Sequence, residues 1–384
     1  MDLLKLVVVI GIVSLNSAAW ANDANSPQLS SDYSHAKLDK QIEKAPEKEL
    51  NNKAINWFPI IFYTQESSLA LGAGTMRAFK KPNAEANARS NNITAMAFYT
   101  LNKQFLIELA PEFYFFKESF NLKMRANYSK MPSLFFGTGE HVPEDYEGED
   151  YVAKNSYFQG DFIAKLFRSF RAGLRYEWHD YTVTEKEAGG LLDQGFFIGE
   201  DGGTISGAGL ILDQDNRDNT FAATSGAYHQ FIAMKYTDKL GSDFEFNQYI
   251  IDLRQFIPIN KKGVLALQGL AIFSDGEVPF NRLSQLGGSM IMRGIYQGRY
   301  RDKNILALQG EYRRPFKHRW YYSVFASIGE VAPSGSEFNG SNLKVTAGGG
   351  VRYALDPKNK MHLRFDVGVS EFGVSPIIIL GEAF

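Results

Sequence analysis

From Trp57 onward, apolar and polar residues alternate in segments of about ten residues that are separated by turn-forming residues. In residues 361–369 every odd-numbered residue is apolar, whereas the even-numbered residues are His, Arg, Asp and Gly. Residues 320–329 show a similar alternation. Successive side chains of a strand point to opposite faces, so each segment predicts a strand with one apolar and one wetter face. Repeated along the chain, this pattern is typical of a transmembrane β-barrel, with lipid outside and a polar lumen inside.

Counting such segments gives sixteen candidate strands, and closed bacterial barrels have an even number. The predicted fold class is therefore all-β, a transmembrane antiparallel β-barrel of 16 strands. The strand centres lie near residues 60, 74, 96, 109, 125, 161, 176, 208, 231, 251, 269, 309, 324, 349, 365 and 380. We expect the last strand to cover residues 376–384 and to end at the aromatic Phe384.

The predicted connections fall into two sets along the chain. One set is mostly tight, as at residues 260–263 and 356–359. The other set contains long polar insertions at residues 132–154, 186–202, 276–303 and 332–341. Short periplasmic turns and long extracellular loops are the expected asymmetry of an outer-membrane barrel.

The first 21 residues predict a cleaved signal peptide. Lys5 precedes an apolar run over residues 6–15, and Ala19-Trp20-Ala21 has the form of a cleavage site. A membrane-anchoring helix is the alternative, but it needs roughly 20 apolar residues and this run is about half that length. Residues 22–56 are polar and predict a short periplasmic tail, loose or with a brief helix, before the barrel of residues 57–384.

The amino-acid composition limits the partners, metal sites and cofactors that we expect. The 41 Lys and Arg residues nearly cancel the 43 Asp and Glu residues, which makes nucleic acid an improbable partner. With no Cys, the chain has no disulfide, Cys-ligated zinc or iron–sulfur cluster. We expect no cofactor and no metal site. Aromatic residues make up 14% of the chain at a mean hydropathy of -0.25, values that suit half-apolar strands better than membrane helices.

Residues 286–302 carry a specific resemblance. This Gly-rich segment, with Arg293 and Gly294 at its core, resembles the sixth extracellular loop of the BamA/TamA superfamily of bacterial surface-antigen barrels. Ile295 stands where that core normally has an aromatic residue, and Tyr296 follows it.

Two further stretches support the resemblance by lying in the right order. The first contains Asp215, Arg217 and Asp218, continues to Gly226, and resembles the acidic, Arg-containing periplasmic turn of the superfamily. The second, residues 131–139, resembles a strand-end motif of its short members.

The resemblance implies a lock between the loop and the barrel wall. In the superfamily the loop arginine folds into the lumen and meets an acidic residue of the following strand, matched here by Glu311. A buried cation without an acceptor is costly, so Arg293 needs such a partner. Ser327 stands where the next strand normally supplies an Asp, and Asp366 or Glu330 is the candidate substitute. The alternative is that Arg293 is an exposed loop cation.

The resemblance also sets an expectation for function. Superfamily members that insert or secrete proteins carry periplasmic POTRA modules, and residues 22–56 are too few for one, so the chain resembles a branch without them. We expect it to assist insertion or translocation of a protein or lipid at the outer membrane, at the seam between its first and last strands. Its expected partners are outer-membrane lipid, a protein or lipid substrate, and an accessory periplasmic protein or a second copy. The main alternative is a passive or gated pore for small solutes, because a barrel of this size can hold an aqueous channel.

An outer-membrane enzyme is the third class considered. His179 with Asp180, or His362 with Asp366, are the candidate pairs, but no nucleophile motif accompanies them. Adjacent residues of a strand point to opposite faces, which separates His179 from Asp180. We therefore expect no enzymatic activity.

Overall fold

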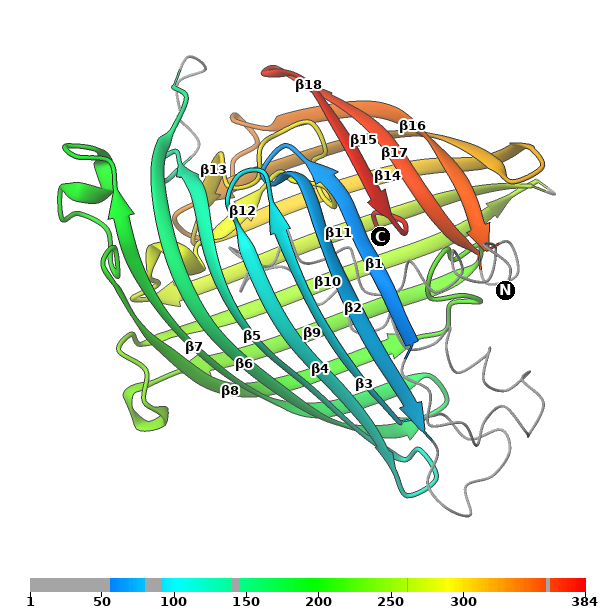
Figure 1. The fold of residues 1–384 in the computed structure, drawn as a ribbon, viewed down its shortest axis with the longest axis horizontal. Coiled ribbons are helices and arrows are strands. Elements are labelled where there is room, and N and C mark those ends of the chain that lie inside the picture. The colour runs from blue at the N-terminus through cyan, green and yellow to red at the C-terminus, as the bar shows by residue number, and fades with distance from the viewer. Residues whose placement is uncertain (1–55, 80–90, 140–145, 261, 357–359) are drawn as a thin grey trace.

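The computed structural model describes residues 56–79, 91–139, 146–260, 262–356 and 360–384. The predicted signal peptide and nearly all of the predicted tail lie outside these residues. Within them the chain forms one closed antiparallel barrel of sixteen strands, and a separate two-stranded sheet lies in one loop (Figure 1). No helix among the described residues is long and apolar enough to cross a membrane.

The predicted strand count is confirmed, and every predicted centre falls inside a strand. The barrel strands are β1 (Asn56–Thr64), β2 (Ser68–Phe79), β3 (Asn91–Thr100), β4 (Phe105–Phe115), β5 (Phe120–Phe135), β6 (Glu149–Phe167), β7 (Phe170–Lys186), β8 (Gly202–Asp215), β9 (Gly226–Tyr236), β10 (Phe246–Ile259), β11 (Gly263–Gly276), β14 (Asn304–Lys317), β15 (Trp320–Ala332), β16 (Lys344–Asp356), β17 (Met361–Ser370) and β18 (Gly373–Leu380). Short elements in the loops are η1 (Leu191–Asp193), η2 (Asp238–Leu240), η3 (Phe280–Arg282), β12 (Ser284–Leu286) and β13 (Tyr300–Asp302).

The two faces of the wall follow the alternation in the sequence. On β14 the polar residues Gln309, Glu311 and Arg313 are buried, whereas the neighbouring Leu308 is 63% exposed. On β15 Val324 is likewise exposed. Exposed apolar side chains on the outside and buried polar ones on the inside are the arrangement expected of a wall between lipid and a polar lumen.

The longest connections between the described strands lie on one rim of the barrel. The turn rim carries the connections β4–β5, β6–β7, β8–β9, β10–β11 and β14–β15. The loop rim carries β5–β6, β7–β8, β9–β10, β11–β14 and β15–β16, and also the short connections β1–β2, β3–β4 and β17–β18. The β11–β14 connection, residues 277–303, is called the long loop below, and it contains η3, β12 and β13.

Two predicted boundaries and one predicted facing need correction. β5 continues to Phe135 and β6 begins at Glu149, so strands occupy both ends of the predicted insertion at residues 132–154, and Met131, Ser133 and Phe135 keep the inward-facing alternation to the end of β5. The last strand ends at Leu380 rather than at the chain end. Met361 is buried, although Leu363 and Phe365 on the same predicted face of β17 are exposed, and the ladder to β16 is irregular beside it.

The barrel closes weakly where its first and last strands meet. Among the described residues, β1 and β18 pair at one position, Tyr63 opposite Ile378. By contrast, β17 and β18 pair at eight positions and β1 and β2 at nine. This seam is therefore the least hydrogen-bonded junction of the wall.

Candidate functional site

The long loop lies directly against the inner face of β17. Gly294 has a left-handed backbone (φ 119°), which glycine adopts without strain. A Cβ atom on Gly368 of β17 would lie 2.5 Å from the backbone carbonyl of Arg293. Gly294 is also held by Ser370, whose Oγ donates a hydrogen bond of 2.7 Å to its carbonyl oxygen. The two glycines, Gly294 in the loop and Gly368 in β17, thus allow the loop backbone to contact the strand.

This close approach places Arg293 inside the barrel. Its side chain is fully buried, and its Nη2 donates to Oε2 of Glu311 at 2.5 Å. Its Nη1 donates to Oδ2 of Asp366 at 2.5 Å, and its guanidinium lies 3.5 Å from the ring centre of Phe325. The structure therefore brings together the predicted pair, and the alternative of an exposed loop cation is wrong.

The second carboxylate of the lock comes from β17, not from β15. Asp366, one of the two predicted substitutes, occupies that role. Ser327 is buried on the inner face, but its hydroxyl has no hydrogen-bond partner among the described residues. Glu330, the other candidate, accepts backbone N–H bonds from Asn339 and Gly340 in the β15–β16 loop. Neither Ser327 nor Glu330 contributes to the lock.

The carboxylates that hold Arg293 are shared with other arginines. Glu311 Oε1 accepts bonds of 2.8 Å from Arg313 Nε and from Arg352 Nη2. Asp366 accepts a hydrogen bond from Arg352, and Arg364 Nη1 lies 3.4 Å from its Oδ2. A third carboxylate, Glu382, accepts from Arg352 Nε at 3.1 Å. We call these residues the lock cluster: Arg293, Glu311, Arg313, Arg352, Arg364, Asp366 and Glu382. Four guanidinium groups thus face three carboxylates.

The lock cluster includes the end of the chain. After β18, Gly381 takes a left-handed backbone (φ 95°), and its N–H donates to the carbonyl of His362 at 2.8 Å. Glu382 is therefore buried beside Arg352, and its Oε1 lies 2.6 Å from Nδ1 of His362. Arg313 donates to the backbone carbonyl of Phe384 at 3.1 Å. An acidic residue near the end of the last strand would be unusual if it faced lipid. The turn at Gly381 instead directs Glu382 toward the inside of the barrel.

A second arginine of the long loop, which the sequence did not single out, is anchored elsewhere on the wall. Arg282 in η3 is fully buried and donates from Nη2 to Oε2 of Glu177 on β7 at 3.1 Å. Glu177 also accepts hydrogen bonds from the hydroxyl groups of Tyr157 and Tyr236. The guanidinium of Arg282 lies 5.2 Å from the ring centre of Tyr236. The alternation of β7 places Glu177 in the lumen, but no local motif marks Arg282 as its partner.

The rest of the loop motif contacts the rim. Ile295 is buried in the apolar cluster of the loop, and the ring of Tyr296 lies 5.5 Å from that of Phe136. The N–H of Gln297 donates to a side-chain oxygen of Glu66, in the connection between β1 and β2, at 2.9 Å. The loop therefore reaches the neighbourhood of the seam.

The strand-end motif of residues 131–139 also meets the long loop. The N–H of Gly139 donates to the carbonyl of Arg301 at 2.8 Å, and Arg301 Nη2 lies 3.4 Å from the carbonyl oxygen of Leu134. Two of the three stretches that carried the resemblance are thus in direct contact.

The predicted acidic turn forms on the turn rim, between β8 and β9. Arg217 donates from Nη2 to Asp215 at 2.7 Å. Asp218 accepts from the N–H groups of Thr224 and Ser225 and from Lys360 Nζ at 2.8 Å.

Two further features of this turn are the lowered pKa of Asp218 and the left-handed backbone of Gly226. Burial acts to raise the pKa of Asp218, but the hydrogen bonds from Lys360 and Thr224 outweigh it and lower the pKa to about 2. Gly226 has φ 95°, and a Cβ there would lie 2.5 Å from the carbonyl of Asn216. The motif therefore builds a closed, ion-paired turn.

Comparisons with known proteins agree with this geometry. The profile of the Omp85 superfamily domain matches residues 83–370. The fold is similar to BamA from Haemophilus ducreyi lacking POTRA domains 1-3, with a TM-score of 0.61 and 13% identity over 85% of this chain and 70% of that chain. No curated protein matches.

Two further solved structures are similar in fold. CdiB from Acinetobacter baumannii gives a TM-score of 0.57 and 11% identity over 86% of this chain and 60% of that one. CdiB from Escherichia coli gives 0.56 and 9% identity over 86% and 63%. This chain therefore spans less than two thirds of each CdiB chain. A barrel of this type points to the bacterial outer membrane. The family match covers most of the chain and agrees with a sixteen-stranded barrel that holds a loop arginine inside, so the chain belongs to the Omp85 superfamily.

Proposed function

We propose that this barrel assists the insertion or translocation of a protein or lipid at the bacterial outer membrane, and that the seam between β1 and β18 is where the substrate engages. The observation that carries the proposal is a seam with a single paired position, beside a long loop whose Arg293 and Arg282 are ion-paired to strands of the wall. This role needs no catalytic residue, so we propose that the protein is not an enzyme.

The anchoring of the long loop favours this role over a diffusion pore. Arg293 is tied to β14 and β17, whereas Arg282 is tied to β7. Around the barrel, β14 and β7 are separated by β11, β10, β9 and β8. A loop tethered to both of these parts of the wall crosses the lumen, which leaves little room for free passage of solutes.

The composition of the seam strands favours lateral access. Pro59 on β1 and Pro376 on β18 cannot donate hydrogen bonds to a ladder, and prolines are confined to edge strands for this reason. The turn at Gly381 takes the last residues out of pairing range and into the lumen. Opening the seam therefore breaks few hydrogen bonds compared with opening any other junction of the wall.

A disulfide across the seam tests the proposal, because the chain has no cysteine of its own. Tyr63→Cys with Ile378→Cys places two thiols at directly paired positions, where Cα atoms lie about 4.5–5.5 Å apart. The control is Ala97→Cys with Ile107→Cys, a paired position between β3 and β4. The readout is the rate at which a small urea-denatured outer-membrane barrel folds into vesicles that contain each variant.

The wild-type protein should accelerate folding of the test barrel. The oxidised seam variant should lose the acceleration and regain it on reduction, whereas the control disulfide should have no effect. Acceleration that survives the oxidised seam disulfide would contradict lateral access. Absence of any acceleration, together with large steady currents through the wild-type barrel, would favour the solute pore.

A further inference from the structure

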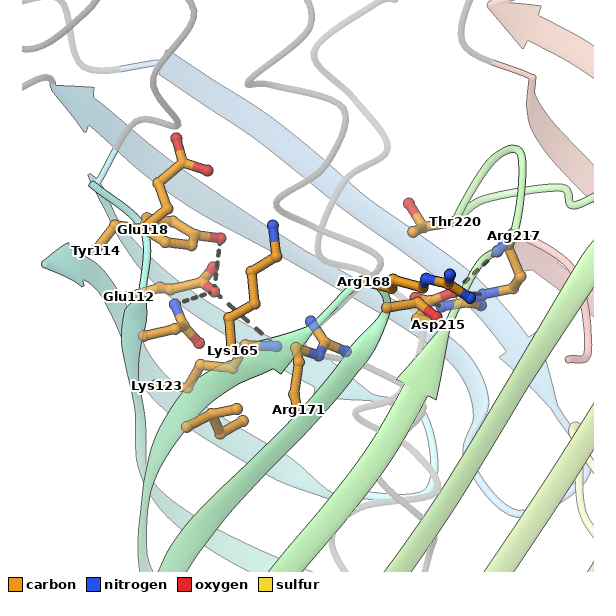
Figure 2. Close-up of a pocket in the computed structure, with 13 residues that line it drawn as sticks. Glu112, Tyr114, Glu118, Lys123, Lys165, Arg168, Arg171, Asp215, Arg217 and Thr220 are labelled. Atoms are coloured by element: carbon orange, nitrogen blue, oxygen red, sulfur yellow. Dashed lines mark hydrogen bonds and ion pairs between the residues drawn. The ribbon is translucent and has the colours of Figure 1, made fainter. Parts of the chain in front are cut away.

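A cavity of about 270 Å³ opens on the inner wall at the turn rim, and none of its lining residues belongs to the lock cluster. It lies between the ends of β4, β5, β6 and β7 and the β8–β9 turn (Figure 2). Five of its lining residues are cationic, Lys123, Lys165, Arg168, Arg171 and Arg217. Three are carboxylates, namely Glu112, Glu118 and Asp215. The surplus of cations attracts negative charge.

Three of the five cations are already engaged. Arg171 Nε lies 2.5 Å from Oδ1 of Asp213, which sits opposite it on β8. Arg217 is paired with Asp215 in the turn. Lys123 Nζ lies 4.0 Å from Glu112. These pairs fix the walls of the cavity and hold their cationic groups in place.

The remaining two cations are available to a ligand. The side chains of Lys165 and Arg168 are exposed and make no hydrogen bond or ion pair with another described residue. Figure 2 shows Lys165 extending into the space between the Glu112–Lys123 pair and the group formed by Arg168 and Arg217. The strand register places Lys165 opposite Arg171, so the two cations face the same cavity from adjacent strands.

We propose that this cavity binds a phosphate group, either of a soluble phosphate or of a lipid headgroup. A phosphate monoester carries about −1.5 to −2 charges at pH 7, which suits two available cations better than the single charge of a carboxylate. Guanidinium forks match phosphate oxygens, and the ammonium of Lys165 adds a point charge. The site does not depend on the function proposed above, because it involves neither the long loop nor the seam.

The test is calorimetric titration of the purified barrel with inorganic phosphate in phosphate-free buffer. The variant Lys165→Gln/Arg168→Gln removes the two available cations without breaking an interaction between described residues. The matched control, Lys317→Gln/Arg319→Gln, removes the same charge from two exposed residues at the β14–β15 turn of the same rim. The charge-preserving variant Lys165→Arg/Arg168→Lys separates loss of charge from loss of fold. A second arm replaces inorganic phosphate by vesicles of phosphatidylcholine with or without phosphatidate.

We expect saturable binding by the wild type, a loss of at least about tenfold in the Gln pair, and near wild-type affinity in the control and the charge-preserving variant. Saturation by inorganic phosphate identifies a soluble ligand, and saturation only with phosphatidate identifies a headgroup. No saturable binding in either arm would overturn the proposal. Equal losses in the Gln pair and in the control would also overturn it, because the attraction would then be a general property of the rim.

Discussion

The two arginines that hold the long loop inside the barrel lie in different charge environments. Arg293 belongs to the lock cluster, where its carboxylates also serve Arg313, Arg352 and Arg364. Arg282 instead pairs with Glu177, whose other partners include tyrosine hydroxyl groups. In the first anchor an acid is shared among several cations. The stability lost on removing a residue therefore depends on how many charged partners lose their counter-charge. In the lock cluster we expect a larger loss on removing the shared carboxylate than on removing Arg293.

The largest effect is expected from Glu311→Ala. This change removes the one acceptor that Arg293, Arg313 and Arg352 all contact in a buried cluster, and breaking buried pairs costs about 3–5 kcal/mol of unfolding free energy. Urea unfolding followed by heat-modifiable migration on gels measures it.

Ser327→Ala is the matched control for this change, because its hydroxyl is buried nearby without a partner among the described residues. It should change stability by less than about 0.5 kcal/mol. Equal losses in the two variants would show that the cluster is not held together by charge.

At the second anchor, Glu177→Gln should cost about 2 kcal/mol of unfolding free energy. The amide keeps one of the two oxygens that accept from the hydroxyl groups of Tyr157 and Tyr236, and it removes the negative charge that pairs with Arg282. The same urea unfolding assay measures the loss. A loss as large as that of Glu311→Ala would erase the difference between the two anchors.

The double variant Glu311→Ala/Arg293→Ala sharpens the comparison. Without Glu311, four guanidinium groups face two carboxylates, so removal of Arg293 should relieve repulsion and recover about 1 kcal/mol relative to Glu311→Ala alone. A double-mutant cycle in urea measures the recovery. Strictly additive losses would mean that the two residues do not share a site.

The smallest effect concerns pH at the acidic turn. The pKa of Asp218 is lowered to about 2 in the folded barrel, so the stabilisation is present above its unfolded pKa of about 4 and is lost as the pH falls toward 2. Because the carboxylate is partly exposed and screened by solvent, this amounts to less than about 1 kcal/mol. Unfolding at pH 5 and at pH 2 should therefore differ slightly more in the wild type than in Asp218→Asn. A larger pH response in Asp218→Asn would reverse the sign and contradict the ion pair with Lys360.

The sequence predicts one anchor better than the other for a physical reason. Strand alternation places Glu311 and Glu177 in the lumen alike, but only Arg293 lies in a recognisable glycine-rich motif. Arg282 finds Glu177 through a tertiary approach that no local pattern encodes.

The end of the chain shows where alternation fails as a guide. Extended pairing was predicted up to Phe384, but the left-handed turn at Gly381 brings Glu382 to Arg352, His362 and Arg313. A glycine allows such a turn without requiring it, so the charge partners that favour the turn become visible only in three dimensions.

Single-channel conductance in planar bilayers tests most directly the claim that the long loop is held across the lumen from two parts of the wall. The variant Arg282→Met/Arg293→Met removes both anchoring charges and replaces each side chain by an uncharged one of similar length. The wild type should be nearly closed, each single variant should open intermittently, and the double variant should show a larger, sustained conductance. Large steady currents through the wild type, or a double variant that stays as closed as the wild type, would contradict the account.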